Sequence, residues 1–235
     1  MTYKIWLAFC GTLFLFPPSL YAQDRTIKVQ GNAVVAAAPD QATFTMGVET
    51  RQPSAQQALK ENNDLMAKIT SALKQEGVDG KDIQTSDFSL RPVYSTPKEG
   101  ESLDVKAYIV AHRLTVRTYD IAKVGVLLDK ANQAGANRFE GLTFGVRDDA
   151  PLRRKAQAAA VEDARQQAKV YAEAMGVVLG RALSLNAGAA YGPPTPLRAM
   201  AFMQDAPGSV PIQPGELNFN ATADVVWEVM DLVIK

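Results

Sequence analysis

The chain has 235 residues, with 25 basic residues, 25 acidic residues and one histidine, so its formal net charge is zero. A chain without a positive surplus has no general attraction for nucleic acid or for an anionic membrane surface. The length is sufficient for one large or two small hydrophobic cores. The composition therefore predicts a globular protein and argues against a nucleic-acid-binding one.

The N-terminus predicts a signal peptide over residues 1–22. Lys4 gives a positive start, an apolar run covers 5–16, and Ala22 offers a small residue for cleavage. The run is shorter than the ~20 apolar residues of a membrane span, and no later run reaches that length. An uncleaved anchor is the alternative. Cleavage would remove Cys10, the only cysteine, and with it any disulfide, thiolate or cysteine-bound metal. We therefore expect an exported protein that is located in the periplasm or is associated with the outer membrane.

Three segments have the periodicity of amphipathic helices. Apolar residues recur at intervals of three and four over residues 53–77, 120–135 and 148–176. Each segment ends at a glycine, a residue that takes positive φ at a helix end without steric cost. Asp149 and Pro151 suit the start of the third helix, where anions are favoured and no proline N–H is needed.

The intervening segments alternate apolar and polar residues, as half-buried strands do. Such strands are predicted over residues 42–50, 82–94, 106–118, 139–146 and 216–229. Within the second of them, Phe88, Leu90 and Tyr94 share the apolar face. The order of elements predicts an α+β fold, in which three helices pack on one face of mostly antiparallel sheets in two ferredoxin-like lobes.

The expected domain after the signal peptide is residues 23–235. Its lobes are expected at about 23–118 plus 216–235, and at 119–190. A proline-rich arm over 187–215 lacks periodicity, and loops of that length are usually functional or disordered.

Four apolar residues make this arm less polar than a disordered linker: Leu197, Met200, Phe202 and Met203. Flexible methionines suit an adaptable contact surface. We hypothesise that the arm packs on a neighbouring subunit or lines a groove. The alternative is an arm that folds back on its own domain.

The sequence has none of the standard signatures of catalysis. It lacks the glycine-rich phosphate and dinucleotide loops, the serine elbow, and the ligand spacing of calcium or zinc sites. We therefore expect no cofactor, no metal and no catalytic residue. Asp148-Asp149 suit a helix start, and Glu162-Asp163 suit a solvated helix face. A carboxylate-dependent hydrolase is the least supported class of function.

His112 lies on the strand predicted over 106–118. Alternation places it on the face of Val110 and Leu114, so we expect it to point into a mostly buried layer and to be structural. Arg113 and Arg117 fall on the opposite face and are candidates for contacting a partner.

Five short fragments occur in this order along the chain: Pro39-Asp40, "DIQT" at 82–85, "GAN" at 135–137, Asp163-Ala164 and "PGE" at 214–216. With the segments around them, they resemble the SIMPL-domain family of bacterial envelope proteins along nearly the whole mature chain. The resemblance implies an exported α+β protein of the periplasm or outer membrane. Members are linked to oxidative-stress defence, and others are known as immunogenic antigens. It also implies oligomerisation, and it brings no catalytic site with it.

The leading hypothesis is a non-enzymatic envelope protein that acts by self-assembly or binding and supports oxidative-stress tolerance. Its expected partners are copies of itself, another envelope protein or a small molecule. The alternative is a periplasmic ligand-binding protein with a pocket between its two lobes.

Overall fold

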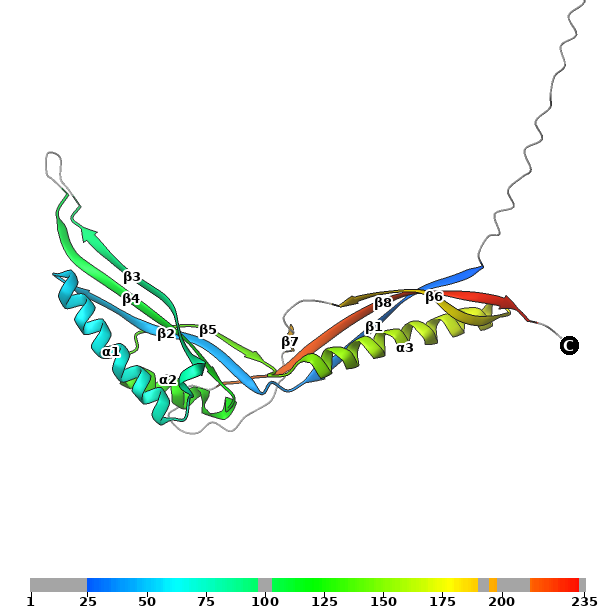
Figure 1. Ribbon diagram of the computed structural model, residues 1–235, viewed down its shortest axis with the longest axis horizontal. Helices are drawn as coiled ribbons and strands as arrows, with labels where there is room; N and C mark the ends of the chain where they lie inside the picture. The colour runs from blue at the N-terminus through cyan, green and yellow to red at the C-terminus, as the bar shows by residue number, and fades with distance from the viewer. Residues whose placement is uncertain (1–24, 97–102, 190–194, 198–211, 233–235) are drawn as a thin grey trace, which may run out of the picture.

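In the computed structural model, the fold is described for residues 25–96, 103–189, 195–197 and 212–232. These residues form three α-helices and two antiparallel sheets of four strands each (Figure 1). The α+β class that the order of elements predicts is confirmed.

One sheet contains four strands: β2 (Gln41–Gln52), β3 (Ile83–Tyr94), β4 (Val105–Thr118) and β5 (Arg138–Gly145). Their order is β3-β4-β2-β5, with every neighbouring pair antiparallel. Helices α1 (Ala55–Gln75) and α2 (Val124–Gln133) pack on one face (Figure 1). The chain order βαββαβ with this strand order is the split βαβ arrangement of ferredoxin-like folds. We call this unit the ferredoxin-like lobe.

The other sheet contains β1 (Thr26–Ala37), β6 (Val177–Ala189), β7 (Thr195–Leu197) and β8 (Glu216–Asp231). Its order is β1-β8-β6, and the short β7 also pairs with β8. Helix α3 (Ala150–Ala174) covers one face of this sheet (Figure 1). We call this unit the α3 lobe. The two lobes lie end to end, which gives the molecule an elongated shape.

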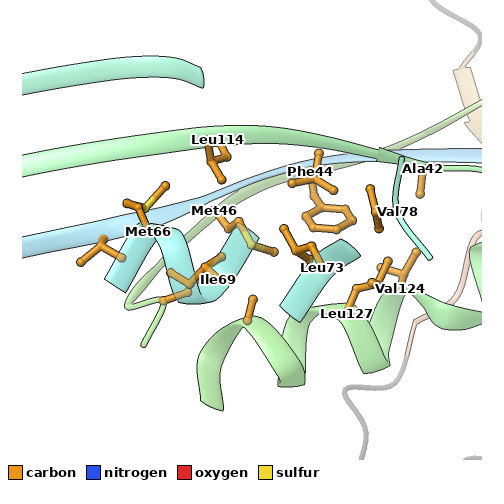
Figure 2. Close-up of a cluster of buried hydrophobic side chains, with 14 residues drawn as sticks. Ala42, Phe44, Met46, Met66, Ile69, Leu73, Val78, Leu114, Val124 and Leu127 are labelled. Carbon is orange, nitrogen blue, oxygen red and sulfur yellow. The ribbon is translucent and has the colours of Figure 1, made fainter. Parts of the chain in front are cut away.

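The core of the ferredoxin-like lobe lies between the sheet and its two helices (Figure 2). Alternate residues of β2 point into it and meet the apolar stripe of α1, so the two sequence periods converge on one layer. The largest of its fully buried side chains include Phe44, Met46, Val48, Ile69, Leu73 and Leu127.

The helix side of the core in the α3 lobe is built from small residues. Every fourth residue of α3 from Ala156 to Ala172 is a buried alanine. At Gly31 of β1 the approach is so close that an added Cβ would lie 2.0 Å from the carbonyl oxygen of Ala160. Small side chains on both surfaces therefore let helix and sheet pack almost backbone to backbone.

The helix ends follow the glycine pattern. Gly77, Gly135 and Gly176 have φ values of 96°, 111° and 68°, as expected. The second helix begins at Val124 and not at residue 120, because a 3-10 turn, η2 (Ile121–Lys123), precedes it. A similar turn, η1 (Gly80–Asp82), precedes β3.

The two sheets group the elements differently from the expected lobes at 23–118 plus 216–235 and at 119–190. β1 and β8 pair, as that division implies, but β2, β3 and β4 share their sheet with β5. Residues after 150 belong mainly to the α3 lobe. The difference arises because strand pairing joins distant segments, and periodicity does not indicate which strands will pair.

Candidate functional site

The acidic pairs of the sequence have structural partners. Asp148 accepts a hydrogen bond from the backbone N–H of Ala150 at 3.2 Å, and Asp149 forms an ion pair with Arg153 at 2.7 Å. Asp163 accepts a hydrogen bond from the backbone N–H of Asn32 at 2.9 Å. Across the described ranges, no three His, Cys, Asp or Glu side chains gather as metal ligands would.

His112 lies on β4 and faces α1, on the face that alternation predicts, but its side chain is only half-buried. Its Nε2 lies 3.4 Å from the hydroxyl oxygen of Thr85. The Phe88 ring stands edge-on to the imidazole, with centroids 5.4 Å apart. Desolvation lowers the pKa of His112, and the charge of Asp87 opposes that shift. The imidazole thus lacks the hydrogen-bonded carboxylate that orients a catalytic histidine, in the part of the chain that the structure describes.

His112 lines a groove between α1 and the two strands β3 and β4. The volume of this groove is about 470 Å³, which falls in the range of small-molecule sites. We call it the α1 groove. Its lining consists of Asn63, Met66, Ala67, Thr70, Ser71, Lys74, Thr85, His112 and Leu114.

Two buried polar atoms near this groove have no hydrogen-bond partner among the residues that the structure describes. Asn62 is fully buried, and its amide nitrogen donates to the carbonyl oxygens of Val48 and Val110 at 3.1 and 3.2 Å. Its Oδ1 is unpaired, as is Nδ1 of His112. Asn62 was missed from the sequence, although the apolar stripe of α1 is interrupted between Leu59 and Leu65.

The two arginines expected to contact a partner lie on the open face of the sheet, opposite the helices. Arg113 is held by Asp87, with Nη1 and Oδ2 2.7 Å apart, and Glu140 lies 3.7 Å from its Nε. Arg117 is about half exposed and lies 4.0 Å from the buried carboxylate of Asp82. Of the two, Arg117 is therefore the less engaged within the chain.

The proline-rich arm is described only at its two ends, and Met200, Phe202 and Met203 lie outside the described residues. Leu197 belongs to β7, which pairs with the start of β8 at Glu216. On the other side, Ile212 packs against the core of the ferredoxin-like lobe. Both described ends of the arm therefore lie against their own chain.

Exposed apolar residues occur on both lobes, and two groups of them lie on elements far apart in the molecule, on β3 and near the C-terminal end of α3 (Figure 1). On β3, Phe88, Leu90 and Tyr94 are 51%, 41% and 51% exposed, although alternation predicts a half-buried face. They remain uncovered because α1 packs on β2 and β4 and hardly reaches the edge strand. We call these three residues the hairpin patch.

Near the C-terminus of α3, Val170, Tyr171 and Met175 are 60%, 50% and 63% exposed. Tyr171 and Met175 are one helical turn apart and therefore neighbours on the helix surface. We call Tyr171 and Met175 the helix patch.

The fold and these surfaces define an elongated α+β protein that presents a groove and two apolar patches. The chain belongs to the SIMPL family, described as a protein of unknown function (DUF541), whose profile matches residues 27–227. It is 31% identical over 229 residues to the "26 kDa periplasmic immunogenic protein" of Brucella melitensis biotype 1, covering 94% of this chain and 92% of that protein.

The same identity and coverage hold for the protein of that name in Brucella abortus. The chain is also 28% identical over 205 residues to the "Uncharacterized protein YggE" of Escherichia coli K12, covering 86% of this chain and 82% of that relative. The protein is periplasmic, as the names of its Brucella relatives indicate. No helix among the placed residues is long and apolar enough to cross a membrane.

Proposed function

We propose that this periplasmic protein acts without catalysis, by assembling with copies of itself, and that the assembly supports tolerance of oxidative stress. The observation that carries the proposal is the pair of apolar patches far apart on one elongated chain. Clustered exposed apolar residues commonly mark interaction sites on soluble proteins. The oxidative-stress part of the proposal rests on the family resemblance.

The positions of the patches favour a head-to-tail contact. A hairpin patch and a helix patch on one chain lie too far apart to cover each other. If the hairpin patch of one copy packs on the helix patch of the next, both patches of every interior copy are covered, and one free patch remains at each end of the row. Such heterologous contacts close into rings or extend as filaments.

The test is the solution mass of the chain and of two variants, Leu90→Glu and Met175→Glu. Both positions are exposed, so neither substitution disturbs the core. Each variant alone should be monomeric, because it lacks one of the two complementary patches. An equimolar mixture should form dimers, because each variant supplies the patch that the other lacks.

Val34→Glu is the matched control, since Val34 is 62% exposed but lies on β1, outside both patches. It should assemble like the unaltered chain. A monomeric unaltered chain would reject the proposal. Assembly that survives both patch variants would do the same. If Leu90→Glu abolishes assembly and Met175→Glu does not, the contact joins two hairpin patches and the head-to-tail geometry is wrong.

The stress function is tested in a deletion strain. Expression of the unaltered chain should restore survival under peroxide, whereas Leu90→Glu at equal periplasmic abundance should not. Full rescue by the assembly-deficient variant would separate the stress phenotype from assembly. Membrane fractionation of the same strains would show whether the assembled form associates with the outer membrane.

A further inference from the structure

We propose that the α1 groove binds a single-chain monocarboxylate, with its carboxylate beside Lys74 and its apolar chain directed toward Phe88. This inference goes beyond assembly, because it assigns a ligand class to a site between helix and sheet. It also differs from the expected inter-lobe pocket, since every residue that lines the groove belongs to the ferredoxin-like lobe.

The charge of the lining favours an anion. Among the described residues, Lys74 is the single charged one in its lining at neutral pH, and no aspartate or glutamate lines the groove. In the described part of the chain, the ammonium group of Lys74 takes part in no ion pair within 4.0 Å. A ligand with an ammonium group would find no carboxylate in the lining, so an amino-acid zwitterion fits less well than a simple carboxylate.

Hydroxyl groups near Lys74 complete the head-group site. Thr70 and Ser71 come from the same end of α1, and Thr85 comes from β3. Nδ1 of His112 has no partner among the described residues, so we propose the tautomer that carries its proton on Nε2, which donates to the Thr85 oxygen. The hydroxyl hydrogen of Thr85 is then available for the carboxylate. His112 is in this way a positioning residue.

The rest of the groove suits an apolar chain. Met66, Ala67 and Leu114 contribute apolar surface, and Phe88 lies beyond them against His112. The α1 residues that line the groove run from Asn63 to Lys74, which corresponds to about 16 Å of helix. A chain of about eight carbons extends roughly 10 Å, given bonds of about 1.5 Å, and therefore fits between the head-group site and Phe88.

The experiment is calorimetric titration of the full chain with octanoate, octan-1-ol and octylamine. We expect saturable binding of octanoate, with both neutral and cationic analogues at least about tenfold weaker. This contrast corresponds to loss of a charge-assisted hydrogen bond. Absence of saturable octanoate binding, or equal binding of octan-1-ol, would overturn the proposal.

Two variants locate the site. Lys74→Gln should weaken octanoate binding about tenfold, whereas Lys68→Gln on another side of α1 should leave it unchanged. Ala67→Trp should abolish binding, because Ala67 is exposed and a large ring there fills the groove without entering the core. Equal effects of the two lysine variants, or unchanged binding in Ala67→Trp, would show that octanoate binds elsewhere.

The same titration on Met175→Glu separates this inference from the proposed function. Met175 lies in the helix patch, outside the groove, so an assembly-deficient chain should still bind octanoate. If the unaltered chain binds octanoate but does not assemble, only the proposed function fails. If assembly occurs and octanoate does not bind, only the ligand assignment fails.

Discussion

Gly31 of β1 lies directly beneath Ala164 of α3. A Cβ at Gly31 would lie 2.4 Å from the backbone nitrogen of Ala164 and 2.0 Å from the carbonyl oxygen of Ala160. The nearest atoms belong to the backbone, so no side chain can rotate away to make room. The close packing of α3 on its sheet therefore requires a glycine at position 31, because any other residue would add a Cβ.

Gly31→Ala should for this reason destabilise the protein by about 2 kcal/mol or more, since overpacking a tight core typically costs 1–3 kcal/mol. Urea unfolding followed by circular dichroism measures the effect. Asn220→Ala, at an exposed position of the same sheet, should change the unfolding free energy by no more than about 0.5 kcal/mol. A Gly31→Ala variant as stable as this control would contradict the packing.

Asn62→Asp should be strongly destabilising at neutral pH. The change removes the amide donor that serves Val48 and Val110 and buries a carboxylate in its place. We expect a loss of about 3 kcal/mol or more at pH 7, because a buried unpaired charge is costly. Asn63→Asp, on the exposed neighbour, is the matched control and should be nearly neutral.

The penalty in Asn62→Asp should shrink as the pH falls. Burial favours the neutral acid, so the folded-state pKa of this aspartate is raised above that of the unfolded chain. The part of the penalty that comes from the buried charge is present in full above the folded pKa and disappears as the pH falls toward the unfolded pKa, about 3.9. Unfolding at pH 7 and pH 4.5, relative to Asn63→Asp at each pH, measures this recovery.

Protonation of His112 should destabilise the folded state when the pH is lowered. Desolvation lowers its pKa in the folded chain below the ordinary 6.5, so the unfolded chain takes up the proton first. The contribution to stability is complete above pH 6.5 and declines as the pH falls from 6.5 toward the folded pKa. The unfolding free energy of His112→Asn should therefore fall less between pH 7.5 and pH 5.5 than that of the unaltered chain.

Proton NMR of the single imidazole provides a direct check of the same pKa. Its titration midpoint should lie below 6.5, and Asp87→Asn should lower it further, because the Asp87 charge raises the pKa of His112. A midpoint at or above 6.5 in the unaltered chain would contradict the desolvated position of the ring.

Asn137→Ala should open the edge of β2 beyond the end of β5. The Asn137 amide accepts from the backbone N–H of Glu49 at 2.8 Å and donates to the carbonyl oxygen of Glu49 at 2.9 Å, as a further strand residue would. We expect a loss of about 1–2 kcal/mol from two hydrogen bonds. Hydrogen exchange at the Glu49 amide should accelerate, whereas the surface variant Asn132→Ala should leave it unchanged.

The local structure was largely predictable from the sequence, because it depends on neighbouring residues. The 3.6-residue and two-residue periods located the three helices and the faces of most strands, and glycine marked each helix end where positive φ is needed. The orientation of His112 toward the helix side followed from the same alternation.

The arrangement of the strands required the tertiary structure. Gly31 pairs with Ala223, nearly two hundred residues away, and no local period encodes that choice. Because α1 packs on β2 and β4 and hardly contacts β3, the apolar face of β3 stays exposed at Phe88 and Leu90. Burial of Asn62 likewise depends on two strand carbonyls that only folding brings to α1. Sequence periodicity thus determined which face each element buries, whereas contacts between distant segments decided what covers that face.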